Sequence, residues 1–286
     1  MKKNELYFRL SRGDGREGME CEYTTVPVVA CDEYNVYICR GDTVTSSDIG
    51  ESVIGSVPWT IVKFVRRDKQ YYFLTTEGSL WSGGQLLATN VKDFNTRYVL
   101  SVDGRVWTVH GKEVDIPFPV VRLFGDLVLD AQHILYDAHG QYITSDVAEA
   151  TTDGNEIVVI HQDSTRRLEY IGDNTNKDEL LYQILQIQGA QKAVINQGTL
   201  LLLANGVLIA AGANKNCECG TDEVPIPIPR RLEFPAPVVD FDFHQRVGWA
   251  LLTNHVLYVW GYNDSDSLFF LQWTGEHFIS PRPLLV

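Results

Sequence analysis

Few residues of this 286-residue chain have the types and spacing that chemistry requires. Cys217 and Cys219 form a Cys-Glu-Cys sequence, which is the nearest approach to a metal-binding motif. A structural zinc site needs four ligands, usually supplied as two spaced pairs, and the sequence has no matching second pair. We therefore expect two loop thiols here, and no metal or other cofactor.

The candidates for catalysis are dispersed along the chain. The seven histidines are dispersed over residues 110–277, and His139 and His255 fall at predicted turns. There is no phosphate-binding G-x-x-x-x-G-K-[ST] loop, no H-E-x-x-H and no G-x-S-x-G. Because no catalytic cluster is present, the sequence predicts a protein that is not an enzyme.

Short apolar runs separated by tight turns are the dominant pattern. In the clearest copy, residues 201–220, two apolar runs flank Asn205-Gly206. Asn-Gly favours a two-residue type I′ turn, because both central positions need positive φ. Residues 250–269 repeat the arrangement, with Asn254-His255 as the predicted two-residue turn. The flanks are rich in Val, Ile, Leu, Tyr and Trp, which predicts β-hairpins.

The hairpin recurs from end to end of the chain. Seven copies begin at Val28, Phe73, Tyr98, Ile134, Ile157, Leu201 and Ala250. Their mean spacing of roughly 35–40 residues is that of a propeller blade or a solenoid repeat. One hairpin is not stable alone in water, so the copies must cover one another. With no Ser/Gly-rich or charged linker between copies, we expect one domain over residues 1–286.

The last two copies resemble repeats of the regulator of chromosome condensation family. A repeat of that family has an apolar strand, a tight turn, an aromatic strand ending in Trp-Gly, an Asn, a Gly-Gln-Leu-Gly-like loop and a Pro-x-x-Val. The matching residues are Leu251-Leu252-Thr253, Val256–Trp260, Gly261 and Asn263, and, one repeat earlier, Asn214, Gly220 and Pro237-Val238. The resemblance is clearest over the last third of the chain. It implies an all-β fold, a single β-propeller of seven blades, each of four antiparallel strands.

The two ends of the chain carry strand candidates without a neighbouring partner. These are Leu6–Leu10 and Pro281–Val286. A propeller closes by pairing its terminal segments in one blade, which removes an open sheet edge. We therefore expect the two segments to share a blade. An eighth blade is the alternative, if Leu6–Leu10 begins a blade of its own.

Three connecting segments also have a predicted character. Val147–Gly154 is expected to be a linker between blades. Lys177–Gln188 has apolar residues at helical spacing but could equally form an outer strand. Pro225, Pro227 and Pro229 precede Arg230-Arg231. Because proline cannot donate a backbone hydrogen bond, we expect this segment on an outer strand or at the rim.

The chain is acidic, with a net charge of −13 and a pI near 4.9. Nucleic-acid binding usually requires a basic face, and no run of Lys or Arg exceeds a pair, so direct nucleic-acid binding is not expected. No apolar stretch reaches the roughly 20 residues of a membrane span. The N-terminus lacks the apolar core of a signal peptide. An odd number of cysteines, five, suggests reduced thiols inside a cell, in the cytoplasm or the nucleus.

Three polar segments interrupt the repeat pattern and are candidates for binding. They are Asp42–Ser56, expected to be a loop, Asp173–Glu179 and Asn214–Glu223. The predicted partner-binding residues within them are Asp42, Asp48, Glu51, Asp173, Lys177, Asp178, Asn214, Lys215 and Asp222. A mostly acidic set attracts a basic surface, and salt weakens that attraction. We therefore expect a protein partner with a basic contact surface.

Two classes of function fit these observations. The favoured one is a non-enzymatic scaffold for protein–protein interactions, or a subunit of a larger assembly. The alternative, implied by the family resemblance, is a guanine-nucleotide exchange factor for a Ran-like small GTPase. Such a factor stabilises the nucleotide-free GTPase by differential binding and performs no covalent chemistry.

Overall fold

The computed structural model of the chain describes residues 28–31, 36–40, 43–46, 53–56, 60–67, 70–172, 183–215, 219–222, 224–244, 247–261 and 278–283. These residues form seven antiparallel sheets and one short helical turn at residues 183–185. The strands of each sheet follow one another in the chain and in space.

The first four sheets contain β1 to β15. The first is β1 (Val28–Cys31), β2 (Val36–Arg40), β3 (Thr43–Ser46) and β4 (Val53–Ser56). The second is β5 (Ile61–Arg67), β6 (Gln70–Thr75), β7 (Leu80–Ser82) and β8 (Gln85–Ala88). The third is β9 (Val91–Phe94), β10 (Tyr98–Ser101) and β11 (Val106–Thr108). The fourth is β12 (Val120–Phe124), β13 (Leu127–Asp130), β14 (Leu135–Asp137) and β15 (Tyr142–Thr144).

The last three sheets contain β16 to β26. The fifth is β16 (Val147–Thr152), β17 (Ile157–His161) and β18 (Leu168–Ile171). The sixth is β19 (Ala190–Asn196), β20 (Thr199–Ala204), β21 (Val207–Gly212) and β22 (Ile226–Arg231). The seventh is β23 (Val238–His244), β24 (Val247–Leu252), β25 (Leu257–Gly261) and β26 (Phe278–Pro283).

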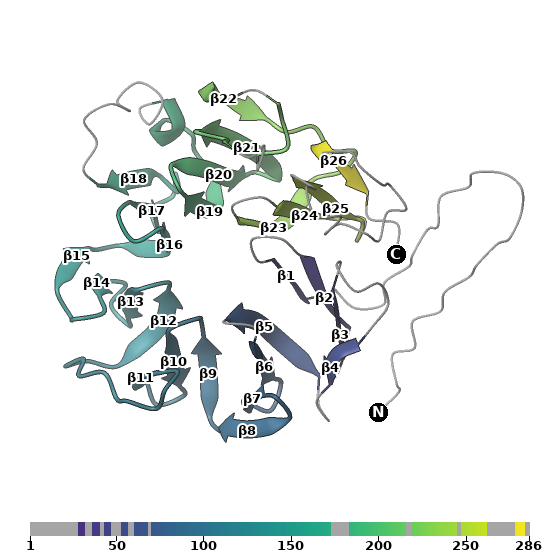
Figure 1. Ribbon diagram of the computed structural model, residues 1–286. Coiled ribbons are helices and arrows are strands. Elements are labelled where there is room, and N and C mark those ends of the chain that lie inside the picture. The colour runs from purple at the N-terminus through teal and green to yellow at the C-terminus, as the bar shows by residue number, and fades with distance from the viewer. Residues whose placement is uncertain are drawn as a thin grey trace, which may run out of the picture.

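The seven sheets are arranged as blades around a common centre (Figure 1). The first strand of each blade is innermost, and the later strands lie progressively farther out. Strand β1 contacts β23 and β24, so the seventh blade meets the first and the ring is closed. The chain is therefore a seven-bladed β-propeller, as the sequence predicts.

Not every blade has the four strands that the family resemblance implies. In the described residues the third and fifth sheets have three strands each. In the third blade only a single bridge, between Trp107 and Glu113, stands where a fourth strand would pair. Pro117 and Pro119 follow it, and because they lack a donor they cannot extend the pairing. In the fifth blade, the next secondary-structure element described after β18 is the helical turn at residues 183–185.

The turn between the second and third strands is the most regular feature of the repeat. At Asn205-Gly206 the φ angles are 51° and 76° and Ala204 pairs with Val207, which confirms the predicted two-residue turn. The second predicted two-residue turn is wrong. His255 N donates to the Leu252 carbonyl over 2.9 Å and Leu252 N to Val256 O over 3.0 Å, so the loop has three residues. Its third residue, His255, has the positive φ of 64°.

The three-residue turn recurs in the second, third and fourth blades with different residues at its last position. These residues are Gly78, Gly104 and His133, all with positive φ. The turn at His133 corrects a prediction about the fourth blade. The hairpin predicted from Ile134 is the outer pair β14–β15, and its Gly140 is not at the second-to-third turn of that blade.

Each such turn also holds the next blade. The Gly78 carbonyl accepts a hydrogen bond from Val91 N over 2.9 Å, and the Gly104 carbonyl accepts one from Val120 N over 2.9 Å. In the same way Gly206 O accepts from Val238 N over 2.8 Å. In each case the donor is the first residue of the innermost strand of the following blade. The backbone is thereby hydrogen-bonded across the boundary, where apolar side chains also pack.

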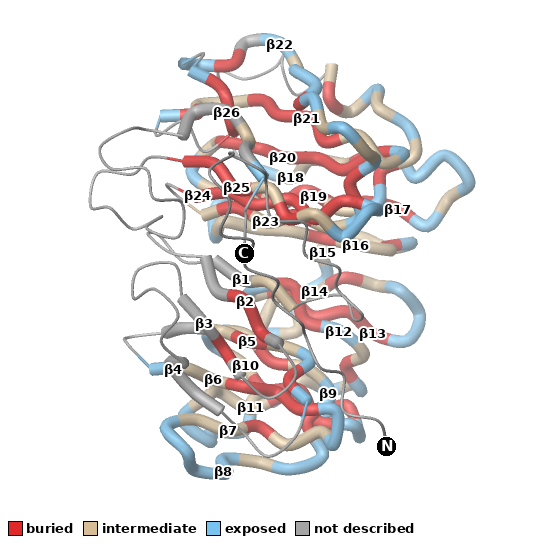
Figure 2. Tube along the Cα trace, turned by 90° about the vertical axis from the view of Figure 1, so that its right-hand side faces the viewer, coloured by how far each residue is buried: buried red, intermediate tan, exposed pale blue. Residues whose placement is uncertain are grey.

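The apolar core is divided among the boundaries between blades. The boundary between the sixth and seventh blades contains Leu201, Leu208, Phe241, Phe243 and Trp260, all buried. Figure 2 shows buried residues running along the strands and exposed residues at the turns. Burial of apolar surface between blades is the main stabilising term for the ring.

The innermost strands share a β-bulge that reorients one side chain. In the second to seventh blades the pairing with the next strand skips the second residue of the first strand. In all six blades the third residue of that strand is charged: Lys63, Asp93, Arg122, Glu149, Lys192 and Asp240. The sign alternates around the ring, from positive in the second blade to negative in the seventh.

These charges form ion pairs across alternate boundaries. Lys63 Nζ lies 2.6 Å from Asp93 Oδ1, and Lys192 Nζ lies 2.8 Å from Asp240 Oδ1. The pair Arg122 and Glu149 makes the third contact, at 2.5 Å. Blades two and three, four and five, and six and seven are thus joined in pairs. The first blade has Ala30 at the third position of β1 and is left out of the series.

Several segments differ from their predicted structure. Asp42–Ser56 is not a continuous loop, because Thr43–Ser46 and Val53–Ser56 are strands β3 and β4. Val147–Gly154 is not a linker, since it contains the innermost strand β16. The proline-rich segment forms β22, the outermost strand of its blade, as predicted.

The closure prediction is tested at one end only. Part of Pro281–Val286 lies in β26, on the outer edge of the seventh blade. Leu6–Leu10 lies outside the described residues, so its pairing stays a prediction. Within the described ranges no helix has the length and apolar character needed to cross a membrane.

Candidate functional site

The propeller has two flat faces, and different connections lie on each. Neighbouring strands of a blade run in opposite directions. The third strand of each blade therefore ends on the same face as its first strand. We call this face, with its third-to-fourth-strand connections, the loop face. We call the opposite face, with the second-to-third-strand turns and the links between blades, the turn face.

Eight of the nine predicted binding residues follow, in the chain, strands that end on the loop face. Asp48 and Glu51 lie between β3 and β4, Asp173, Lys177 and Asp178 follow β18, and Asn214, Lys215 and Asp222 lie between β21 and β22. In the chain, Asp42 lies between β2 and β3, whose adjoining ends are on the turn face, so its chain position differs from that of the other eight. Of the nine, Asn214, Lys215 and Asp222 are among the described residues.

Asn214 does not fit the predicted role, because its side chain is fully buried. Its Nδ2 donates to the Thr221 carbonyl over 2.9 Å, and its Oδ1 accepts from Cys219 N over 2.9 Å. Its backbone N–H donates to Thr199 Oγ1 over 2.9 Å. Asn214 therefore fixes the shape of the connection and is removed from the set of contact residues.

The same connection is anchored to the seventh blade. A Cβ on Gly220 would come within 3.1 Å of Pro281 and 3.4 Å of the Trp260 ring, so this glycine permits a close approach. Trp260 is fully buried, and Gly248 beside it leaves room for its ring. The Asn, Gly and Trp-Gly elements that carry the family resemblance thus hold one blade's loop against the next blade.

Lys215 and Asp222 are exposed on this connection, and their role in partner binding stays a prediction. Arg230 Nη1 donates to Thr221 Oγ1 over 2.9 Å, which ties the connection to β22 as well. Cys219 is buried, and within the described ranges no three His, Cys, Asp or Glu residues are placed to hold a metal ion. The connection can present charge to a partner.

One connection of the loop face was missed by sequence reasoning. Residues 262–277 follow β25, the third strand of the seventh blade. They contain Asp264, Asp266 and Glu276 and no Lys or Arg. The signal that could have found them is their position after Trp260-Gly261, which corresponds to that of Asn214–Glu223 one repeat earlier.

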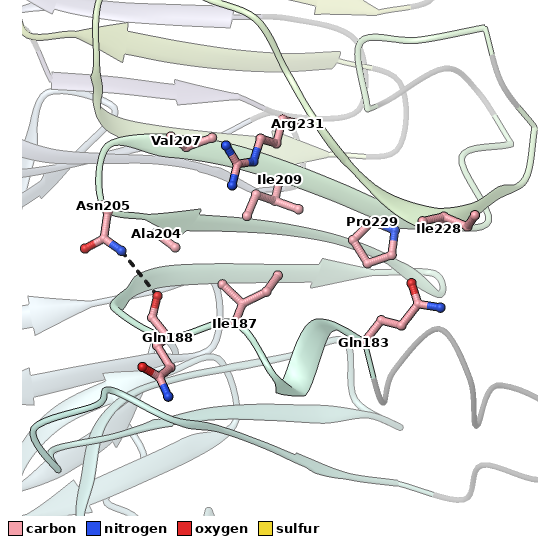
Figure 3. A pocket seen from close by; sticks show the side chains of 10 residues that line it. All are labelled: Gln183, Ile187, Gln188, Ala204, Asn205, Val207, Ile209, Ile228, Pro229 and Arg231. Atoms are coloured by element: carbon pink, nitrogen blue, oxygen red, sulfur yellow. Dashed lines mark hydrogen bonds between the residues drawn. The ribbon is translucent and has the colours of Figure 1, made fainter.

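A groove lies at the rim between the fifth and sixth blades (Figure 3). It has a volume of about 500 Å³. Its floor is formed by Ile187, Val207 and Ile209, which belong to the core between these two blades. Polar groups surround that floor. They are Gln183, Gln188, Asn205 and Arg231.

A cluster of charged residues, Lys192, Asp240, Asp242 and Glu149, lies on the innermost strands near the centre of the ring. Burial acts to lower the pKa of Lys192, but the carboxylates of Asp242, Asp240 and Glu149 more than offset this and raise it. Burial also raises the pKa of Asp242, and Lys192 only partly opposes that effect. Lys192 also donates to the Phe241 carbonyl over 2.6 Å. Because the cation is already engaged, this cluster holds two blades together and does not resemble a catalytic pair.

Solved structures show the same architecture. Yeast RCC1 (Prp20), in a crystal structure with Kap60, has a TM-score of 0.61 and 12% identity, over 98% of this chain and 91% of that chain. Prp20p from Saccharomyces cerevisiae has a TM-score of 0.62 and 12% identity, over 90% and 87% of the two chains. Human WBSCR16 has a TM-score of 0.50 and 15% identity, over 96% and 88%.

No protein-family model and no curated protein matches the sequence. At these levels of identity the structural similarity establishes the fold alone. The chain has an RCC1-like β-propeller fold, as the sequence resemblance implies.

Proposed function

We propose that the protein is a non-enzymatic scaffold that binds a basic protein partner through its loop face, alone or as a subunit of a larger assembly. The observation that carries the proposal is that the strands preceding the acidic connections, β3, β18 and β21, end on the same face. Eight acidic residues follow, in the chain, strands of the first, fifth and sixth blades that end on this face: Asp48, Glu51, Asp173, Asp178, Glu179, Glu218, Asp222 and Glu223.

The anchored connection at 213–222 supports a binding role. Its exposed residues stand on a scaffold fixed by Asn214 and Gly220, so binding does not require ordering of that part of the loop. Preorganisation reduces the entropic cost of association. Like charges gathered on one face also accelerate the approach of an oppositely charged partner, and salt weakens this effect.

The similar yeast protein offers a guide to partner chemistry. Its structure was described together with its binding to Gsp1p and to histones, and in another crystal it is bound to Kap60. Histones are strongly basic proteins that bind DNA phosphates. A basic partner for the acidic loop face of the present chain is consistent with that example.

The second candidate is guanine-nucleotide exchange on a Ran-like small GTPase. The RCC1-like fold is the observation that favours it. It predicts preferential binding of the nucleotide-free GTPase, because an exchange factor acts by stabilising that state. The scaffold proposal predicts no acceleration of nucleotide release.

Affinity capture from native extract tests the proposal. The bait is the full chain, its loop-face variant Asp173→Lys, Asp178→Lys, Asp222→Lys, or a control variant. We expect the native chain and the control to retain a common set of basic proteins that the loop-face variant loses. Equal capture by all three baits would contradict the proposal. Recovery of a Ran-like GTPase, preferentially without nucleotide, would favour the exchange factor.

The control variant carries the same change of charge on the turn face. It is Glu77→Lys, Asp115→Lys, Glu233→Lys. All three residues are exposed, and none makes a side-chain hydrogen bond or ion pair with a described residue. A difference between the two triple variants therefore reports the face of the propeller and not the net charge.

A further inference from the structure

The groove between the fifth and sixth blades has a composition that its surroundings do not share. The chain has 37 acidic and 24 basic residues, yet none of the described residues that line this groove is acidic. Among the described lining residues the one charged side chain is that of Arg231. Arg231 thus places a positive charge in the groove of a protein whose net charge is −13.

Arg231 is available for a ligand. It is exposed, and within the described part of the chain its guanidinium makes no hydrogen bond or ion pair. In Figure 3 it stands above Ile209 at one side of the groove. An arginine fork matches the geometry of a carboxylate and can bind it with two parallel hydrogen bonds.

Part of the apolar lining of the groove is exposed to solvent. Ile228 lines it and retains 64% of its exposure, although isoleucine is among the residues most often buried. Pro229 lies beside it in the same wall. Ile228, Pro229, Ile187 and Val207 together offer aliphatic surface next to one cation.

The amide groups along the groove suit a peptide backbone. Gln183, Gln188 and Asn205 each have both a donor and an acceptor. One Asn205 donor is used, because its Nδ2 donates to the Gln188 carbonyl over 3.3 Å. An extended peptide presents alternating N–H and C=O groups, which such amides can pair.

Recognition by strand addition is disfavoured at this edge. Strand β22 is the outermost strand of the sixth blade, and Pro225, Pro227 and Pro229 supply no backbone donors in or beside it. A partner strand would find few hydrogen-bonding groups on this edge. Side chains in the groove must therefore determine what binds.

We propose that this groove docks an extended segment of another protein in which aliphatic side chains adjoin an Asp or Glu. The aliphatic groups cover Ile187, Val207 and Ile228, and the carboxylate binds Arg231. This partner has the opposite charge to the partner of the loop face. The propeller would then join an acidic segment at its rim to a basic protein at its face.

A matched peptide library tests the proposal. The probes are acetylated, amidated heptapeptides with two Leu, Ile or Val residues and one Glu, each paired with the same peptide carrying Gln. Blocking both ends removes terminal charges, so the side chain is the only carboxylate. We expect a subset of Glu peptides to bind the native chain, and each to bind at least tenfold more weakly after Glu is replaced by Gln.

Two pairs of variants locate the binding. Arg231→Gln should weaken the selected peptides about tenfold, a difference equivalent to about 1.4 kcal/mol. The neighbouring Arg230→Gln, whose guanidinium points to Thr221, should change binding less than twofold. Ile228→Ser should weaken binding, whereas Val224→Ser, which is exposed outside the groove, should not.

Four results would overturn the proposal. They are no binding above a scrambled peptide, equal binding of Glu and Gln peptides, equal effects of the two arginine variants, and a native dimer in sedimentation that Arg231→Gln dissociates. The last result would assign the groove to a second copy of the chain. The loop-face triple variant should bind the peptides normally, so failure here is distinguishable from failure of the proposed function.

Discussion

Lys192 Nζ lies 2.8 Å from Asp240 Oδ1, and these two residues occupy the same position on the innermost strands of adjacent blades. The ammonium of Lys192 also lies near the Phe241 ring, at 5.2 Å from its centroid. The contact is one of three at equivalent positions, and all three place the cation on the earlier blade. Each ion pair thereby joins the innermost strands of two adjacent blades.

Exchanging the two charges tests this contact. Lys192→Asp and Asp240→Lys should each lower stability, because each places like charges face to face. The double variant should recover part of the loss, with a coupling on the order of 0.5–1 kcal/mol for a pair that is partly exposed. Chemical denaturation measures all four corners of the cycle. Additive effects would mean that the two side chains do not interact in solution.

Asp242 should respond to pH in the opposite sense to an ordinary paired carboxylate. Burial raises its pKa above the ordinary value of 3.8, so the folded chain binds this proton more tightly than the unfolded chain. Its contribution to stability is present at low pH and is lost as pH rises through the folded-state pKa. Asp242→Asn removes that loss. We expect its melting temperature to exceed that of the native chain at pH 7 by a few degrees.

Asp240→Asn is the matched control for this measurement. It removes the direct ionic partner of Lys192 and should lower the melting temperature at pH 7. If both variants lower it equally, the Asp242 carboxylate is stabilising and its burial has been misjudged.

Gly206 should tolerate substitution poorly for two separate reasons. Its φ is 76°, and a Cβ at this position would come within 2.9 Å of the Pro237 Cβ. Gly206→Val should cost on the order of 1–3 kcal/mol from backbone strain, with the contact to Pro237 in addition. Gly83→Val is the control, since its φ is 55° with no atom within 4 Å of a Cβ. Equal losses in denaturation would show that the contact across the blade boundary contributes nothing.

Cys39 and Cys219 should resist alkylation in the folded protein. Both are buried, and burial raises the pKa of the Cys39 thiol to about 12. The thiolate is the reactive form, so reaction at pH 8 requires unfolding. Maleimide labelling followed by mass spectrometry should leave both residues unmodified until denaturant is added. Rapid labelling of Cys39 in native buffer would contradict the packing of the first blade.

The repeat could be predicted from sequence because its signals are local. Asn205-Gly206 and its apolar flanks report a turn and two strands without reference to the rest of the chain. Those signals belong mainly to the middle of each blade. The sequence predicts a linker where the structure has the innermost strand β16. The bulge and the charged Glu149 interrupt the alternation of apolar and polar residues that is typical of a strand.

The alternating charges could not be found from one segment at a time. Lys63 and Asp93, or Lys192 and Asp240, are separated by a whole blade, and their relation appears only when the innermost strands are aligned. In the fourth blade the glycine at a turn points to the wrong hairpin. The turn between β13 and β14 has His133 at its positive-φ position, and Gly140 lies in the turn between β14 and β15. Asn214 was assigned to a binding surface because a polar residue in a loop gives no sign that it is buried.

The association rate of a basic partner, measured against salt, tests the central claim most directly. The probe is a purified core histone complex, a basic protein of known composition, with the native chain and the two triple variants. We expect the association rate of the native chain and of the turn-face control to fall steeply with ionic strength. The loop-face variant Asp173→Lys, Asp178→Lys, Asp222→Lys should associate more slowly at low salt and show a flatter dependence. Identical salt dependence for the two triple variants would contradict binding through the loop face.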